Sequence, residues 1–144
     1  MHNYIDLGYL FEHVINTLRL RKTAPWSSKQ TLADWCKYTQ DEANELRDAT
    51  KYDDIAEELG DVIADALTVA MVLETDTKGE HSIQSVLMGI DAKIKRRQPW
   101  IAYGGSPPKT EAEERVIWNT IKAQEAQNRA KLLDALIVES LLET

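Results

Sequence analysis

Apolar side chains recur along this chain every three or four residues, the spacing of one face of an α-helix, and alternating apolar–polar runs are missing. The first apolar stripe predicts a helix from Tyr4 to about Arg21. Its end is basic, with Arg19, Arg21 and Lys22 placed where cations stabilise a helix C-terminus. Glycine and proline are few. The pattern therefore predicts an all-α fold of about five helices.

A second helix is predicted from Thr31 to about Thr50. Thr31 and Asp34 have the spacing of a capping box, in which each side chain accepts a hydrogen bond from the other residue's backbone N–H. Trp35 is expected to pack, and Cys36 is expected to be a small buried hydrophobic residue. The buried stripe of this helix is predicted to consist of Leu32, Cys36, Thr39, Ala43 and Leu46.

Lys51 and Tyr52 form the predicted turn to a third helix, with Asp53 or Asp54 as its cap. Gly60 lies inside this helix, where glycine costs about 1 kcal/mol relative to alanine. Close approach of another helix or of a phosphate would explain it. The residues predicted to face the core are Ile55, Leu59, Val62, Ala66, Val69, Ala70 and Leu73.

The fourth predicted helix ends in the basic run Lys93 to Arg97, before Pro99. The segment Trp100 to Lys109 is predicted to be a loop, and Thr110 with Glu113 forms a second capping box that opens the last helix. The tail of that helix is rich in leucine, and we expect it either to close the core or to contact a second subunit. Its apolar residues are Leu132, Leu133, Leu136, Ile137, Leu141 and Leu142.

Four carboxylates lie on either side of the turn between the second and third helices. Glu42 and Glu45 are three residues apart, and Glu58 and Asp61 have the same spacing, so each pair lies on one side of its helix. If the two helices fold back antiparallel, the four acids converge, and like charges so close need a cation among them. All four offer hard oxygen ligands and no histidine is near in the sequence. This favours Mg²⁺, with Mn²⁺ as a substitute, over zinc or iron.

Composition narrows the class of protein. At 144 residues the chain is predicted to be a single domain covering residues 1–144. The formal net charge of -7 argues against a general nucleic-acid binder, although a metal could still join carboxylates to the phosphates of one nucleotide. Cys36 is the single cysteine, the first residues lack a signal-peptide pattern, and no apolar run is long enough to span a membrane. We therefore expect a cytoplasmic protein with neither nucleic-acid nor membrane partners.

Several motifs occur in the order and spacing of a known family. They are Trp26, Lys29-Gln30-Thr31, Glu42-Ala43-Asn44-Glu45, Glu57-Glu58-Leu59-Gly60-Asp61, Lys93 to Arg97 followed by Gln98-Pro99, and Trp118-Asn119-Thr120-Ile121-Lys122. Together they resemble the MazG-type nucleoside triphosphate pyrophosphohydrolases over roughly residues 14–125. The two acid pairs in their Glu-Glu-Leu-Gly-Asp context are the specific part of this resemblance. The leucine-rich segment 126–144 lies beyond it, as a candidate oligomer contact.

The resemblance implies an antiparallel helical bundle that assembles into a homodimer or homotetramer. It also implies magnesium-dependent hydrolysis of a nucleoside triphosphate between its α and β phosphates, which gives a monophosphate and pyrophosphate. The catalytic, metal-holding carboxylates implied by it are Glu42, Glu45, Glu58 and Asp61. The residues implied to contact the nucleotide are Lys93, Arg97, Trp118 and Lys122, with Trp26 and Lys29 as further candidates.

Three departures from the family pattern bear on base and sugar preference. Family members commonly have Cys-Pro-Trp-Asp in place of Ala24-Pro25-Trp26-Ser27 and Glu-Glu-Ala-Tyr-Glu in place of Asp41-Glu42-Ala43-Asn44-Glu45. They commonly have a histidine in place of Gln98. A pyrimidine-specific deoxynucleoside triphosphatase of the same superfamily therefore stays open. So does a non-catalytic helical dimer that binds nucleotide. A di-iron carboxylate bundle is a third alternative, although neither acid pair carries the histidine that such sites use.

Some candidate residues also have structural explanations. Asp65, inside the most apolar helix, belongs either to the metal shell or to a hydrogen bond between helices. Either Glu45 or Asp65 could orient the attacking water. The basic end of the fourth helix could serve only to compensate the helix dipole. Trp26 and Trp118 could be core or interface anchors instead of surfaces on which a base stacks.

Overall fold

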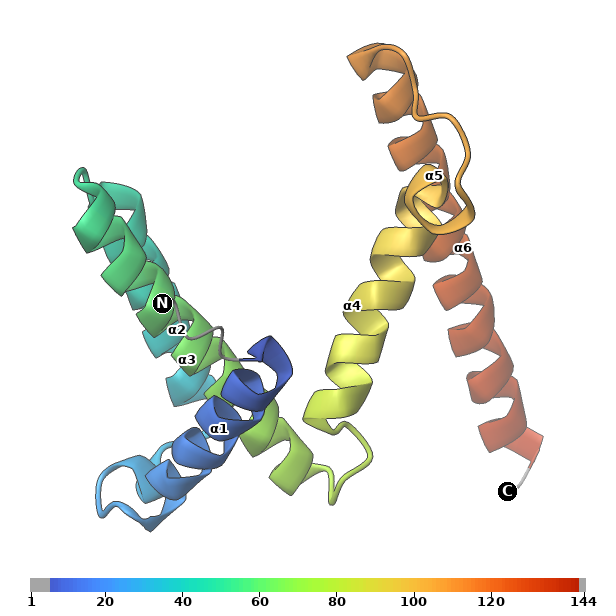
Figure 1. Cartoon of the computed structure of the whole chain (residues 1–144). Coiled ribbons are helices and arrows are strands. Elements are labelled where there is room, and N and C mark those ends of the chain that lie inside the picture. Colours follow the sequence, from blue (N-terminus) through green and yellow to red (C-terminus); the bar gives the residue numbers. More distant parts are fainter. Residues whose placement is uncertain (1–5, 143–144) are drawn as a thin grey trace. The chain divides into compact units, whose positions relative to one another are not determined.

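The computed structural model describes the backbone of residues 6–142 and the side chains of residues 6–136. Over this range the chain forms six α-helices and two short 3₁₀ helices, so the all-α prediction is confirmed (Figure 1). The elements are α1 (Leu7–Arg19), η1 (Leu20–Thr23), η2 (Ser27–Lys29), α2 (Leu32–Asp48), α3 (Tyr52–Asp76), α4 (Ile83–Arg97), α5 (Pro99–Tyr103) and α6 (Glu111–Leu142).

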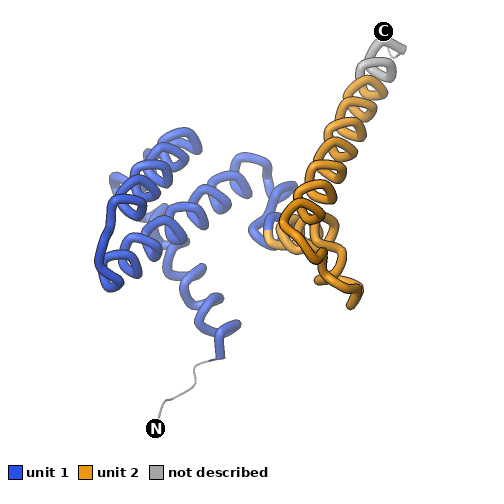
Figure 2. Tube along the Cα trace, turned by 90° about the horizontal axis from the view of Figure 1, so that it is seen from above, with its two compact units in different colours: residues 1–86 blue, residues 87–144 orange. Residues whose placement is uncertain are grey.

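These elements fall into two compact units, residues 1–86 and residues 87–144, which Figure 2 colours separately. The first unit holds α1, η1, η2, α2, α3 and the start of α4. In it α2 and α3 lie side by side as an antiparallel hairpin (Figure 1). The second unit holds the rest of α4 together with α5 and α6.

The start of α2 is the predicted capping box. Thr31 Oγ1 accepts a hydrogen bond from the Asp34 backbone N–H at 3.2 Å, and Asp34 Oδ2 accepts one from the Thr31 N–H at 2.8 Å. The predicted cap of α3 is wrong, because Lys51 occupies that position and makes no capping hydrogen bond through its side chain. Asp53 and Asp54 lie in the first turn instead, where negative charge interacts favourably with the helix dipole.

Part of the predicted loop after α4 is helical. Pro99 is the first residue of α5, a position where its fixed φ suits the helix and its missing N–H would have no helical partner. Gly104 ends α5 in the left-handed region, with φ 65°. Proline thus ends α4 as predicted, but it also starts the next helix, which the sequence interpretation missed.

The buried core of the first unit is small. Ile15, Ala70 and Ile83 are buried, and Leu67 and Met71 pack against them. This core joins α1, α3 and the first turn of α4 around the hairpin. No side chain among the described residues is completely enclosed, since none is less than 2% exposed.

The predicted buried stripe of α2 is partly wrong. Cys36 and Ala43 are exposed, whereas Trp35 is only 4% exposed and Leu32, Thr39 and Leu46 are half-buried. The buried face is centred on the bulky Trp35 because a large aromatic removes more apolar surface from water than a cysteine or an alanine does. On α3, Leu59 and Ala66 of the predicted core are likewise exposed.

The structure also tests the predictions for Gly60 and for the tail of α6. A Cβ built on Gly60 meets nothing within 4 Å, so the expected close approach at this position does not occur within the described chain. On α6, Leu132, Leu133 and Leu136 are 62%, 55% and 53% exposed, so these three do not close a core, and Ile137, Leu141 and Leu142 lie outside the described side chains. Among the described residues, none of the helices combines the length and apolarity needed to cross a bilayer.

Candidate functional site

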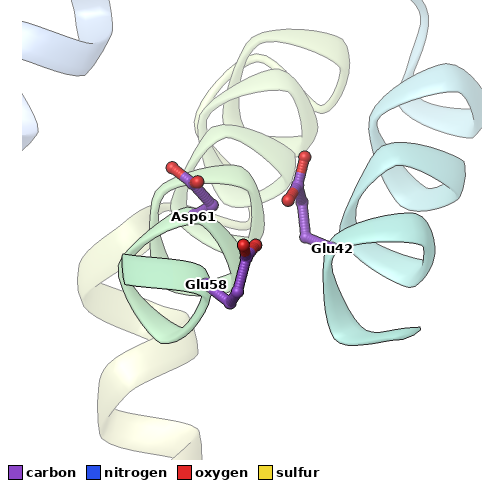
Figure 3. A group of neighbouring side chains, drawn as sticks. All are labelled: Glu42, Glu58 and Asp61. Carbon is purple, nitrogen blue, oxygen red and sulfur yellow. The ribbon is translucent and has the colours of Figure 1, made fainter. Parts of the chain in front are cut away.

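Three of the four predicted carboxylates converge on the α2–α3 hairpin. Glu42 projects from α2, and Glu58 and Asp61 project from α3, as Figure 3 shows. Each offers a ligand oxygen, and these three oxygens all lie within 4.8 Å of one another. The antiparallel return of α3 along α2 brings Glu42 level with Glu58 and Asp61.

The electrostatics of this cluster are those of uncompensated negative charge. Partial burial raises the pKa of Glu42 above its ordinary value, and the nearby Glu45, Asp61, Asp65 and Glu58 raise it further. The pKa of Glu58 is raised in the same way, first by partial burial and then by neighbouring carboxylates. In the part of the chain that the structure describes, no lysine or arginine forms an ion pair with Glu42, Glu58 or Asp61.

Glu45, the fourth predicted ligand, stands beside this group. It is exposed and is not one of the three residues whose oxygens come within 4.8 Å. Its charge nevertheless raises the pKa of both Glu42 and Glu58, and it follows Glu42 by three residues on the same side of α2.

Asp65 makes the helix-to-helix hydrogen bond that was one of its two alternatives. Nη1 of Arg21, in η1, donates to Oδ1 of Asp65 at 2.7 Å and to Oγ1 of Thr68 at 3.0 Å. Asp65 and Thr68 are 7% and 4% exposed. The guanidinium of Arg21 also lies over the ring of Trp35, 5.1 Å from its centroid. Arg21 therefore ties η1 to both helices of the hairpin.

Trp26 lies in an aromatic group of the first unit. Its ring centroid is 6.1 Å from that of Trp35 and 5.5 Å from that of Tyr38. Trp35 and Tyr38 are three residues apart on α2, and this helical spacing could have predicted from the sequence that their rings lie on one side of the helix. Trp26 itself is 58% exposed, so one side of this group faces solvent, while Lys29 is exposed in η2. An exposed indole is available to a planar ligand.

In the second unit, the end of α4 is held by a residue that the sequence interpretation did not single out. Glu125 on α6 accepts hydrogen bonds from Nε and Nη2 of Arg97 and from Nε of Arg96. These contacts lower the pKa of Glu125 to about 2. The Arg97 guanidinium also lies 5.0 Å from the centroid of the Trp118 ring. Glu125 follows Trp118 by two helical turns, so helical spacing could have placed both on one face.

A groove of about 600 Å³ lies between α4 and α6 in this unit. Lys93 and Arg97 both line it, as their spacing of four residues predicts. Trp118 and Lys122 are not among its lining residues, although the Trp118 ring contacts the guanidinium of Arg97, which does line the groove. The lining residues are Lys93, Arg96, Arg97, Thr120, Ile121, Gln124, Glu125, Asn128 and Arg129.

The donor set of the hairpin fits a hard divalent cation. Carboxylate oxygens are the ligands that Mg²⁺ and Mn²⁺ prefer, and a bound cation would relieve the repulsion among these carboxylates, which adds to burial in raising the pKa values of Glu42 and Glu58. The cluster includes no histidine or cysteine, so it does not provide the Glu-x-x-His ligands of a di-iron bundle.

Comparison with known proteins agrees with this geometry. Residues 30–102 match the family model described as the MazG nucleotide pyrophosphohydrolase domain, which includes both acid pairs. The chain is 33% identical to a nucleoside triphosphate pyrophosphohydrolase of Mycolicibacterium smegmatis, over 78% of this chain and 35% of that protein. It is 32% identical to the nucleoside triphosphate pyrophosphohydrolase/pyrophosphatase MazG of Thermotoga maritima, over 83% of this chain and 47% of that protein.

The chain thus spans half the length or less of these two relatives. A solved structure matches more completely. The crystal structure of a mazG-related protein from Thermotoga maritima superposes with a TM-score of 0.66 at 28% identity, and the match covers 78% of this chain and 98% of that one. The helical fold, the carboxylate pairs at the hairpin and the matched residues together show that this chain belongs to the MazG nucleotide pyrophosphohydrolase family.

Proposed function

We propose that this chain is a magnesium-dependent nucleoside triphosphate pyrophosphohydrolase that cleaves between the α and β phosphates. One observation carries the proposal: Glu42, Glu58 and Asp61 present oxygens within 4.8 Å of one another, with no cationic side chain paired to them among the described residues. A triphosphate cannot approach such a cluster without a cation, because both are negative. Family membership and the names of the two relatives support the same reaction.

The reaction consumes one water. A bond forms between the water oxygen and phosphorus, the bridging P–O bond breaks, and the products are a nucleoside monophosphate and pyrophosphate. When bound, Mg²⁺ supplies positive charge that neutralises the phosphate oxygens and lowers the pKa of a coordinated water. Glu42, Glu58 and Asp61 would hold it, and the packing of α2 against α3 sets their relative positions.

The attacking water also needs a base. We assign this role to Glu45, which completes the predicted set of four catalytic and metal-binding carboxylates. It is exposed, near the cluster and outside the group of three, so its carboxylate is available to accept a proton from water. Asp65 is less suited, because Arg21 already donates to Oδ1 of its carboxylate.

For the nucleotide itself, we propose contacts by Lys93, Arg97, Trp118, Lys122, Trp26 and Lys29. Arg97 is held by a stacked indole and a carboxylate, which reduces the freedom it would lose on binding a phosphate. Trp26 offers an exposed ring for a base.

The chain is also proposed to act as a homodimer or homotetramer. Leu132, Leu133 and Leu136 are more than half exposed along α6, and Val116 on the same helix is 66% exposed. Leaving so many large apolar side chains on one helix in water is costly, and burial against a second copy would recover about 25 cal/mol per Å².

A substrate panel tests the reaction. The protein is incubated with each ribo- and deoxyribonucleoside triphosphate and Mg²⁺, and the products are separated chromatographically. We expect monophosphate and pyrophosphate in equal amounts, and a loss of rate of about 100-fold or more in Glu58→Gln and Asp61→Asn. Asp41→Asn, an exposed acid of α2, is the matched control and should retain activity. Release of orthophosphate and diphosphate nucleotide, or full activity in either variant, would disprove the assignment; turnover of pyrimidine deoxynucleotides alone would identify the pyrimidine-specific class.

A further inference from the structure

One side of α3 carries both the acids of the cluster and the two residues that bind Arg21. Successive members of this row are three or four residues apart, so they lie along one face of the helix. The acids come first, and the residues that bind Arg21 follow within the next two turns. In chain order the row is Glu58, Asp61, Asp65 and Thr68.

The facing side of α2 has the matching order in reverse, because the two helices are antiparallel (Figure 1). Trp35 precedes Glu42 by seven residues, which is two helical turns, so both lie on one side of α2. Glu42 meets the acids of α3 at one level of the hairpin. At the other level, Arg21 contacts the ring of Trp35 on α2 and the hydroxyl of Thr68 on α3. The acid cluster and the Arg21 contacts are therefore two neighbouring levels of one helix–helix contact.

Arg21 is a polar bridge between the two helices, and the bridge is shielded from water. Its partners Trp35, Asp65 and Thr68 are all buried. Oγ1 of Thr68 donates its own proton to the carbonyl oxygen of Ala64 at 2.8 Å, so toward Arg21 it can only accept. No other side-chain hydrogen bond or ion pair among the described residues joins α2 to α3.

The acid level of the hairpin has no such support. Glu42 and Glu58 are half-buried and Asp61 is exposed, and their like charges repel one another across the two helices. The distance between α2 and α3 at this level therefore depends on the contacts one to two turns away. Arg21 makes the charge-assisted part of those contacts, which is the stronger kind of hydrogen bond.

We propose that Arg21 is a positioning residue, which sets the spacing of α2 and α3 at the carboxylate cluster and thereby makes the cluster selective for a small divalent ion. This inference rests on the proposed function, because it takes the cluster to be a cation site. Mg²⁺ requires near-ideal octahedral geometry with ligands at about 2.0–2.1 Å, whereas Ca²⁺ accepts flexible geometry at about 2.3–2.6 Å. Carboxylates on two helices that can shift apart should therefore lose affinity for Mg²⁺ before they lose affinity for Ca²⁺.

Calorimetric titration of the full-length chain with Mg²⁺ and, separately, with Ca²⁺ tests the proposal. Arg21→Lys keeps the positive charge but replaces the flat guanidinium, which stacks on Trp35 and donates to α3, with a flexible ammonium. We expect Mg²⁺ binding to weaken about tenfold, the size of other changes just outside a metal's ligands, and Ca²⁺ binding to weaken less than about threefold. Thr68→Val removes one acceptor of Arg21 at constant charge, and it should shift the two affinities in the same direction by a smaller factor.

Arg19→Lys is the matched control. Arg19 lies two residues before Arg21, is half exposed and is 4.0 Å from Glu74, near the far end of α3. This variant should bind both ions as the parent does. Circular dichroism at the temperature of the titration establishes that each variant is folded, so that a loss of affinity does not report unfolding.

The possible outcomes separate this inference from the proposed function. An unchanged Mg²⁺ affinity in Arg21→Lys, in a parent that binds Mg²⁺ and releases pyrophosphate, would overturn the positioning role alone. Equal losses of Mg²⁺ and Ca²⁺ affinity would also overturn it, because they would point to charge and not to geometry. A parent with the expected ion dependence that releases no pyrophosphate would refute the proposed hydrolysis alone. A parent that binds neither ion would refute the cation site, and with it both proposals.

Discussion

Arg21 and Asp65 form an ion pair at 2.7 Å that links η1 to the middle of α3. Asp65 is buried one helical turn beyond Asp61, and its negative charge contributes to the raised pKa of Glu42. Arg21 thus places a positive charge against Asp65, and it forms no ion pair with Glu42, Glu58 or Asp61 among the described residues. Glu42, Glu58 and Asp61 thus have no ion pair among the described residues and are available to a cation. Asp65 instead holds η1, the segment that precedes the hairpin.

Loss of this pair should destabilise the first unit. Arg21→Ala leaves the buried Asp65 carboxylate without its donor, and we expect a loss of about 2 kcal/mol in the free energy of unfolding. Arg19→Ala is the control, because Arg19 is 4.0 Å from Glu74 and half exposed, so its removal should cost less than about 0.5 kcal/mol. Chemical denaturation measures both. Equal losses in the two variants would contradict the importance assigned to the Asp65 contact.

Removing one acid of the cluster should have opposite effects with and without metal. Glu42→Gln relieves like-charge repulsion, so the metal-free variant should melt at a higher temperature than the metal-free parent. Mg²⁺ at a hundred times its dissociation constant should stabilise the parent by about 2.7 kcal/mol, and this gain should be lost in the variant. Thermal melts in EDTA and in Mg²⁺ give both quantities. A Mg²⁺ response in the variant as large as in the parent would argue that the ion binds elsewhere.

Glu125 should make the stability of the α4–α6 contact depend on acid pH. Its pKa is about 2 in the folded chain and near 4.5 in the unfolded chain, so the unfolded state binds the proton more readily. The stabilisation is therefore complete above pH 4.5 and is lost as the pH falls from 4.5 through about 2. Unfolding followed at a series of pH values should show this decline in the parent, and less of it in Glu125→Gln. Glu111→Gln, at an exposed pair, is the control that should leave the profile unchanged.

Gly60→Ala should stabilise the hairpin. A Cβ at this position meets nothing within 4 Å, and alanine is favoured over glycine inside a helix by about 1 kcal/mol. Because Gly60 lies between Glu58 and Asp61, the rate of hydrolysis gives independent information. A more stable variant with unchanged kcat and KM is the expected result. A more stable variant with a raised KM would show instead that substrate or a partner helix approaches the backbone here.

The exposed leucines of α6 should report on assembly. Leu132→Glu with Leu136→Glu places charges in the apolar surface, and we expect the molar mass from light scattering to fall to that of a smaller assembly. Circular dichroism should show unchanged helicity, since both positions face solvent in the single chain. An unchanged mass would place the subunit contact elsewhere on the chain.

The sequence by itself determined the helical class, the capping box of Thr31 and Asp34, and the pairing of the acids. These are local or periodic properties, so spacing along the chain is enough to define them. The family resemblance rested on the same local motifs and was confirmed. One of the wrong predictions was also local, the loop at Pro99, where one residue type is compatible with both a helix end and a helix start.

Only the tertiary structure decided which partner each charged residue has. Nothing in spacing distinguishes Asp65, which pairs with Arg21 across 44 residues, from Asp61, which has no ion pair among the described residues. Glu125 likewise finds Arg97 28 residues away. Helical periodicity fixes the face on which a side chain lies, but the choice between neighbours on that face depends on how helices cross, which is a property of the folded chain. The same reason explains why Trp35, and not Cys36, is the buried residue of α2.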